Sequence, residues 1–239
     1  MSQASDLFNG AIHFVGGEKG GVGKSLVSRL LAQYMIDRNI PFTGFDTDRS
    51  HGALLRFYAG YASAALVDSF EALDAIVESA VADPGRRVLV DLAAQTHDPL
   101  ARWMDESGVL DVAAESGLAV NYWHVMDSGR DSVDLLTRLL DRFGSRLNYV
   151  LVLNQLRGDD FSQLERSGQL ARAQELGART MPLKHLQDAV LRKIDAANAS
   201  FWSARTAPGS EGAKLGLLER QRLRVWLAQV ESEFDRLGV

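Results

Sequence analysis

The sequence has 239 residues, no cysteine and a formal net charge of −5 at pH 7. Hydrophobic residues make up 46% of the chain and charged residues 24%, which is an ordinary globular composition and enough for a single domain over residues 1–239. The lack of cysteine excludes disulfides, thiolate-bound zinc and iron–sulfur clusters and suits a reducing, cytoplasmic location, and no apolar run is long enough to predict a membrane span.

The predicted elements follow a polar stretch, MSQASDLFNG, in which we expect no secretory signal because it has no basic region and no apolar run. After it, apolar runs typical of buried strands alternate with segments of helical periodicity. Strands are predicted at 11–15, 41–46, 86–92, 118–126, 148–154 and 179–183, and helices at 24–38, 71–82, 130–143, 169–176, 185–197 and 215–236. A linker-like stretch, 204–216, is predicted to be a flexible loop. Strands this apolar, alternating with helices, predict an α/β fold with a mostly parallel sheet covered on both faces.

A glycine-rich loop, GGEKGGVGKS at 16–25, lies between the first predicted strand and the first predicted helix. In this position backbone N–H groups and the positive end of the helix dipole converge on phosphates, as in P-loop nucleotide-binding proteins. Lys24 would reach the β- and γ-phosphates, and the hydroxyl of Ser25 would bind Mg²⁺. The residues expected to bind the nucleotide here are Gly20, Gly21, Val22, Gly23, Lys24 and Ser25.

The loop departs from the general phosphate-loop pattern at two positions. Glu18 stands where the first glycine is expected, and Lys19 adds a second cation to a loop that already has Lys24. Packing two ammonium groups side by side costs like-charge repulsion. Lys19 therefore either points to solvent or serves a phosphate on another subunit, as an arginine finger does.

The segment KGGVGKS (19–25) resembles the deviant Walker A motif of the ParA/MinD family of ATPases. In that family the signature lysine crosses the interface of an ATP-sandwiched dimer, and members often replace the first glycine. The resemblance implies that Lys19 is catalytic in trans while Lys24 binds the subunit's own ATP. It further implies an ATP-dependent homodimer with slow hydrolysis that a partner protein stimulates.

Two strand ends carry carboxylates that resemble further motifs of this family. FDTDRS (45–50) places Asp46 and Asp48 at the end of the second predicted strand, on the same side of it. By the resemblance, Asp46 would hold the Mg²⁺ shell and Asp48 would position or deprotonate the attacking water, although solvated carboxylates at strand ends are common. RRVLVDLAAQ (86–95) has the Walker B form, with Asp91 reaching Mg²⁺ through water. The family usually continues with small residues and a glycine, so residues 93–95, Ala-Ala-Gln, leave the γ-phosphate sensor open.

The adenine contacts rest on weaker resemblances. Asn154 ends the strand VLVLN, where the family has an Asn that hydrogen-bonds the base, but an Asn at a strand end also commonly caps a turn. Pro182 in TMPLK resembles the later segment that flanks the base.

The segment 184–224 is locally basic, with eight Lys and Arg residues against four Asp and Glu. The resemblance implies nonspecific DNA binding by this segment in the dimer, and the alternative is a solvated helix face. The last helix carries an apolar stripe that we expect to dock on the sheet. Its acidic end argues against a membrane anchor.

Three classes of function remain open from the sequence. The first is a ParA-like partition ATPase that positions DNA or protein cargo, with the conjugal-transfer or mobilisation branch of the same family as its close rival. The second is a metabolic P-loop enzyme that phosphorylates or amidates a small molecule, which would not need Lys19. The third is a nucleotide-bound scaffold with negligible turnover. The cargo and the partner protein are not predicted.

Overall fold

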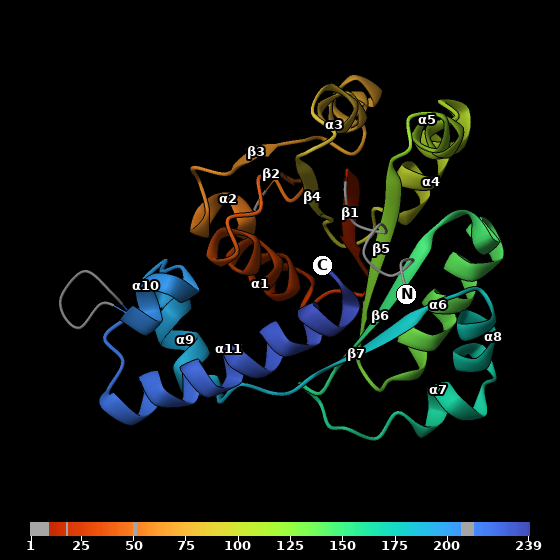
Figure 1. Cartoon of the computed structure of the whole chain (residues 1–239). Coiled ribbons are helices and arrows are strands. Elements are labelled where there is room, and N and C mark those ends of the chain that lie inside the picture. The colour runs from red at the N-terminus through yellow and green to blue at the C-terminus, as the bar shows by residue number, and fades with distance from the viewer. Residues whose placement is uncertain (1–9, 18, 50–51, 207–212) are drawn as a thin grey trace.

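The computed structural model describes residues 10–17, 19–49, 52–206 and 213–239. Within them, seven strands form one sheet in the order β3-β2-β4-β1-β5-β6-β7 (Figure 1). Every neighbouring pair is parallel. The strands are β1 (Ala11–Gly16), β2 (Phe42–Asp46), β3 (Ala62–Ala64), β4 (Arg87–Asp91), β5 (Ala119–Met126), β6 (Asn148–Asn154) and β7 (Arg179–Leu183). The predicted α/β fold with a parallel sheet is therefore confirmed.

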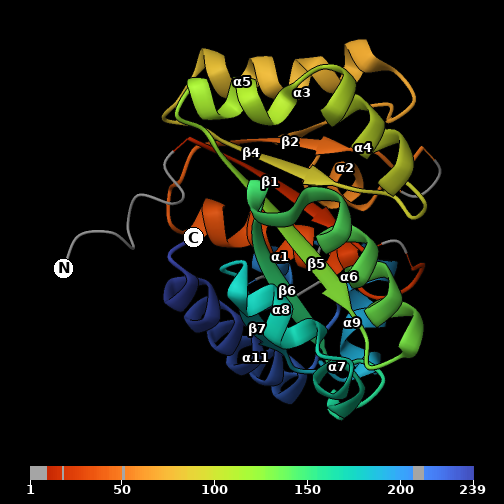
Figure 2. The same ribbon diagram turned by 90° about the vertical axis from the view of Figure 1, so that its right-hand side faces the viewer.

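Helices cover both faces of the sheet (Figure 2). One face packs against α3 (Phe70–Ala82), α4 (His97–Glu106), α5 (Val109–Glu115), α6 (Arg130–Phe143), α7 (Ser162–Arg166) and α8 (Gln169–Glu175). The other packs against α1 (Lys24–Asp37), α2 (Ala53–Phe57), α9 (Asp188–Ala196), α10 (Phe201–Thr206) and α11 (Leu217–Leu237). A 3-10 turn, η2 (Gly144–Arg146), precedes β6. No helix of the described ranges is both long and apolar enough to cross a bilayer.

The apolar runs make this arrangement because a strand turns alternate side chains to opposite faces. In β1, Ile12 and Phe14 point to the side of the sheet that α3 to α8 cover. Val15 points to the opposite side, which α1 and α11 cover. Both faces of the central strands are thus buried, which explains why their sequences are continuous rather than alternating in hydrophobicity. Strand β1 lies between β4 and β5, so the loop that follows it emerges at the middle of the sheet.

Several short elements differ from the sequence-based expectation. The helices α2, α4, α5, α7 and α10 and the strand β3 were not predicted, and most of them are too short to establish a hydrophobic period. The predicted loop 204–216 is wrong at its start, because residues 204–206 complete helix α10, which buries Phe201 and Ala204. Residues 207–212 of that stretch lie outside the described residues.

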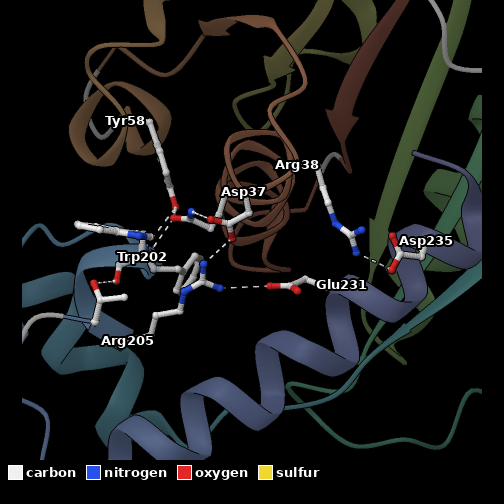
Figure 3. Close-up of polar contacts among 10 residues, drawn as sticks. Asp37, Arg38, Tyr58, Trp202, Arg205, Glu231 and Asp235 are labelled. Atoms are coloured by element: carbon white, nitrogen blue, oxygen red, sulfur yellow. Dashed lines mark hydrogen bonds and ion pairs between the residues drawn. The ribbon is translucent and has the colours of Figure 1, made fainter.

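The C-terminal helices attach to α1, the helix that opens directly after the glycine-rich loop (Figure 3). The guanidinium of Arg205 on α10 contacts Asp37 on α1 at 2.8 Å and Glu231 on α11 at 3.3 Å. On α11, Asp235 pairs with Arg38 just after α1 at 2.7 Å. The predicted docking of the last helix is confirmed, since its stripe is buried: Leu223, Trp226, Leu227, Val230 and Phe234.

Candidate functional site: the glycine-rich loop and its carboxylates

The glycine-rich loop borders a cavity of about 330 Å³ at the carboxyl ends of the central strands. Open parallel sheets bind their ligands at this edge, where the order of the strands reverses. The loop joins β1 to α1, and β2 and β4 end beside it. The structure thus brings together most of the predicted nucleotide and metal residues; the lining is Gly20, Gly21, Gly23, Lys24, Ser25, Leu26, Asp48, Asp91, Leu92, Ala93 and Ala94.

Asn154, at the end of β6, holds this loop in place by a hydrogen bond. Its side chain is 3% exposed, and its Nδ2 donates a hydrogen bond to the carbonyl oxygen of Val22 at 2.7 Å. Its Oδ1 accepts one from the backbone N–H of Leu156 at 3.2 Å, which confirms the turn-capping interpretation. Gly23, at φ 101°, passes so close that an added Cβ would lie 2.4 Å from Asn154 Nδ2. The adenine contact of Asn154 stays a prediction, because its carboxamide already holds the loop.

Lys24 follows the glycines of the loop and is the first residue of α1. Its side chain is buried, at 7% exposure, and its Nζ donates a hydrogen bond to the carbonyl oxygen of Lys19 at 3.1 Å. A buried ammonium group needs partners of this kind, because its charge is costly to remove from water. The cation therefore lies at the loop, where a phosphate group would be its natural counter-ion.

Asp91 is a buried carboxylate at the end of β4, 2% exposed. Neither of its oxygens has a hydrogen-bond partner among the described residues. Burial raises the pKa of Asp91 to about 7, and the nearby carboxylate of Asp46 adds to the rise, while the hydroxyls of Ser28 and Ser25 and the charge of Lys24 oppose it. A buried carboxylate beside the hydroxyl of Ser25 is a pair of oxygen ligands that fits a hard cation such as Mg²⁺.

The described residues hold no cluster of three or more His, Cys, Asp or Glu side chains that could bind a metal ion unaided. Mg²⁺ is commonly held by one or two protein ligands together with phosphate oxygens and water. Ser25 and Asp91 are the residues that could hold it.

Asp46 has a structural use that the sequence did not reveal. It is 1% exposed, and its Oδ2 accepts hydrogen bonds from the backbone N–H groups of Leu54 at 2.8 Å and Leu55 at 3.1 Å, so that it caps the start of α2. Its Oδ1 accepts another from the N–H of Asp48 at 3.0 Å. Burial raises the pKa of Asp46, and these backbone hydrogen bonds oppose the rise. A role in the Mg²⁺ shell stays a prediction for this residue.

Thr47 joins the two carboxylate-bearing strand ends, and sequence reasoning missed it. Its Oγ1 donates to the carbonyl oxygen of Asp91 at 3.0 Å and accepts from the backbone N–H of Ala93 at 2.8 Å. This connection places Asp48, the next residue, at the cavity. The only available signal was its place between the two aspartates of the Asp-x-Asp pattern.

The segment after Asp91 contributes backbone rather than charge. Ala93 and Ala94 line the cavity, and Gln95 has a positive φ of 62° with an exposed side chain. A non-glycine residue in this conformation costs energy and is commonly found near functional sites. No glycine is present at this turn, and a γ-phosphate sensor here stays open.

Lys19 does not point freely into solvent. Its Nζ lies 3.2 Å from Asp127 Oδ2 and 3.6 Å from Asp131 Oδ2, and its side chain is 24% exposed. Both carboxylates belong to the same subunit. The neighbouring Glu18 lies outside the described residues.

The remaining predicted residues lie away from the cavity. Pro182 is exposed on β7 and borders a groove beside α11 together with Lys184. In the basic segment, Lys193 pairs with Glu219 at 2.7 Å, and Arg205 is part of the α1–α11 network. The exposed cations of this segment are Lys184, Arg192, Lys193, Lys214, Arg222 and Arg224.

Comparison with known proteins gives structural but no sequence matches. No family model and no curated protein matches this sequence. A nucleotide-binding protein from Archaeoglobus fulgidus in complex with ADP has a TM-score of 0.50 at 13% identity, over 82% of this chain and 92% of that chain. A variant of McdA from Cyanothece in complex with ATP has a TM-score of 0.48 at 12% identity, over 96% of each chain. The signal recognition particle 54 kDa protein from Aeropyrum pernix in complex with GDP has a TM-score of 0.44 at 18% identity, over 95% of this chain and 48% of that chain.

These likenesses concern the arrangement of the chain and not its activity. Only the first reaches a TM-score of 0.5, and no conclusion rests on the other two. The parallel sheet and the strand–loop–helix at its centre agree with that match. The chain therefore shares its α/β fold with that nucleotide-binding protein.

Proposed function

We propose that this protein is an ATPase of the ParA/MinD type, which dimerises around ATP and uses slow hydrolysis to time the positioning of a cargo. The observation that carries this proposal is the presence of two lysines in one phosphate loop with different surroundings. Lys24 is buried at the loop beside Ser25 and Asp91, whereas Lys19 lies across the loop against Asp127. A single nucleotide needs only the first of these cations.

The roles of the chain's own residues follow from their places. The backbone N–H groups of 20–25 and the ammonium of Lys24 would bind the phosphates, and Ser25 and Asp91 would hold Mg²⁺. Bound Mg²⁺ would neutralise the charge that develops on the phosphate oxygens. Asp48 borders the same cavity and would orient the attacking water. Lys19 would act on the nucleotide of the partner subunit, as an arginine finger supplied in trans does.

DNA is the cargo or track that the basic segment supports best. Lys193 and Arg205 are engaged in ion pairs within the chain. The other exposed cations of the segment lie around α9 and α11: Lys184, Arg192, Lys214, Arg222 and Arg224. Cations of this kind contact phosphates without reading sequence, so binding would be nonspecific and salt-sensitive. A plasmid or chromosome partition role, with a partner protein that stimulates hydrolysis, is the form of the proposal we favour.

Three substitutions separate this proposal from a small-molecule P-loop enzyme. Lys24→Ala should abolish binding of a fluorescent ATP analogue, because the phosphate-facing charge is lost. Lys19→Ala should bind that analogue normally as a monomer but fail to form an ATP-dependent dimer. Asp48→Ala should form a dimer that persists, because the water is no longer positioned.

Size-exclusion chromatography with light scattering, with and without Mg-ATP, measures these outcomes. Since Lys19→Ala keeps Lys24, Ser25 and the backbone of the loop, it is the matched control for Lys24→Ala within one loop. A Lys19→Ala protein that dimerises with ATP as the wild type does would contradict a role in trans. A wild-type protein that phosphorylates or amidates a small molecule as a monomer would favour the metabolic alternative.

A further inference from the structure

Asp127, the residue after β5, is a buried anion with donors on both of its oxygens. Its side chain is 2% exposed. Oδ1 accepts hydrogen bonds from the hydroxyl of Ser132 at 2.7 Å and from the backbone N–H of Gly129 at 3.1 Å. Oδ2 lies 3.2 Å from Lys19 Nζ and 3.0 Å from Arg157 Nη1. Two cations from distant parts of the chain thus share one carboxylate oxygen.

The surroundings of Asp127 favour the ionised form of its carboxylate. Burial would raise the pKa of Asp127, but the hydrogen bonds from Ser132, Gly129 and Lys19, together with the charge of Lys19, outweigh burial and hold the pKa below its usual range. The absence of a side chain at Gly129 also makes room for the lysine, because an added Cβ would lie 3.2 Å from Lys19 Nζ. The ammonium group of Lys19 therefore packs closely against Gly129 and Asp127.

We propose that Asp127 is a positioning residue that holds Lys19 against its own subunit and thereby opposes ATP-dependent dimerisation until the lysine is released. The inference rests on the proposed function, in which Lys19 acts on the partner's nucleotide. An ammonium 3.2 Å from a buried carboxylate of its own subunit has to leave that carboxylate before it can cross an interface. The ion pair within the subunit and the contact in trans are mutually exclusive.

Arg157 lowers the cost of this release for the buried carboxylate. When one partner of a buried ion pair is removed, the cost is high because the remaining charge is left uncompensated. After Lys19 departs, Arg157, Ser132 and Gly129 still contact Asp127. If Arg157 were replaced, departure of the lysine would take away the second of the two cations that contact Asp127 Oδ2. Substitutions of Asp127 and of Arg157 should therefore have opposite effects on dimerisation.

The size of the effect follows from the population of the released state. Dimerisation needs the released form in both subunits, and the apparent affinity scales with the fraction that is competent. If a substitution raises the released fraction about tenfold, the dimer Kd falls about 100-fold, since two subunits each contribute one factor. A substitution that lowers the released fraction raises the Kd by the same rule.

The test measures the dimer Kd by sedimentation velocity with Mg-ATP in the full chain. Asp127→Asn keeps an acceptor for Ser132 and Gly129 while removing the charge, and should lower the Kd by about 10- to 100-fold. Arg157→Gln should raise it, and the double variant should behave like Asp127→Asn because no charge remains to be compensated. Asp131→Asn is the matched control, since Asp131 is 76% exposed and 3.6 Å from Lys19, and should change the Kd little.

A second measurement reads the contact itself in the nucleotide-free protein. The Nζ resonance of Lys19 in an NMR spectrum of lysine side chains should shift in Asp127→Asn and remain in place in Asp131→Asn. An unchanged resonance in Asp127→Asn would overturn the ion pair whether or not the protein is an ATPase.

The two readouts distinguish failure of this inference from failure of the proposed function. If the wild type dimerises with ATP and Lys19→Ala does not, the proposed function stands. An Asp127→Asn protein with the wild-type Kd, or Asp127 and Arg157 variants that shift the Kd in the same direction, would then overturn the positioning role alone. A wild type that stays monomeric with Mg-ATP overturns the proposed function, and the role of Asp127 in dimerisation with it.

Discussion

Substitution of Asp91 by Asn tests the electrostatics of the candidate metal site. Asp91 is 2% exposed, and its oxygens have no hydrogen-bond partner among the described residues. Burial, with the charge of Asp46 as a second cause, raises the pKa of Asp91 from 3.8 to about 7. At a pH between 3.8 and about 7, the carboxyl of Asp91 keeps its proton in the folded protein, whereas it has lost the proton in the unfolded chain.

The sign and magnitude of the effect follow from this difference. Because this carboxyl binds more protons in the folded state, the contribution of Asp91 to the stability of the wild type should fall as the pH rises from about 4 to about 7. The difference between 3.8 and about 7 corresponds to a loss of about 4 kcal/mol, complete above pH 7. An amide at this position carries no charge, so the free-energy cost of burying it does not depend on pH. The free energy of unfolding of Asp91→Asn, relative to that of the wild type, should therefore be about 2–3 kcal/mol higher at pH 8 than at pH 5.

Urea denaturation of the nucleotide-free protein at pH 5 and pH 8 measures this difference. Asp159→Asn makes the same chemical change at an exposed position in the loop after β6 and is the matched control. With Mg-ATP present, the wild type should gain more stability than Asp91→Asn, since its carboxylate then has a cation to hold. A relative stability of Asp91→Asn that is the same at both pH values would refute the uncompensated buried carboxylate.

Two further predictions concern Asn154 and the basic face. Asn154→Ala removes the donor to the Val22 carbonyl and should lower the free energy of unfolding by about 1–3 kcal/mol. It should also lower the affinity for ATP. Unchanged results in urea denaturation and in a fluorescent-nucleotide titration would contradict this role of Asn154. Combined Arg192→Glu and Arg222→Glu should weaken DNA binding of the ATP-bound protein for all sequences alike and reduce its salt dependence. Reversal of the exposed Arg102 and Arg130 on α4 and α6 is the control, and DNA binding that survives the first pair or requires one sequence would exclude this face.

The local features of the site could be predicted because each of them depends on a short, continuous stretch of sequence. A strand, a glycine-rich loop and a helix follow one another within residues 11–37, so the place of Lys24 and Ser25 did not depend on distant contacts. Asp91 was predictable for a similar reason, since a charge that closes an apolar strand has to lie at the end of that strand. The parallel sheet followed from the continuous apolar runs, whose two buried faces need helices on both sides.

The tertiary structure decided how the other predicted residues are used. The strand order β1-β5-β6 brings Asp127, after β5, beside Lys19 and brings Asn154, at the end of β6, beside the loop. Both residues are more than 100 positions away from the loop in the sequence. Asp46 is committed to the start of α2, a helix of five residues that has no periodic pattern to predict it. A side chain of Lys, Asp or Asn can make many different contacts, and only the folded neighbourhood selects among them, because the free energy of each contact depends on burial and on the partners that share it.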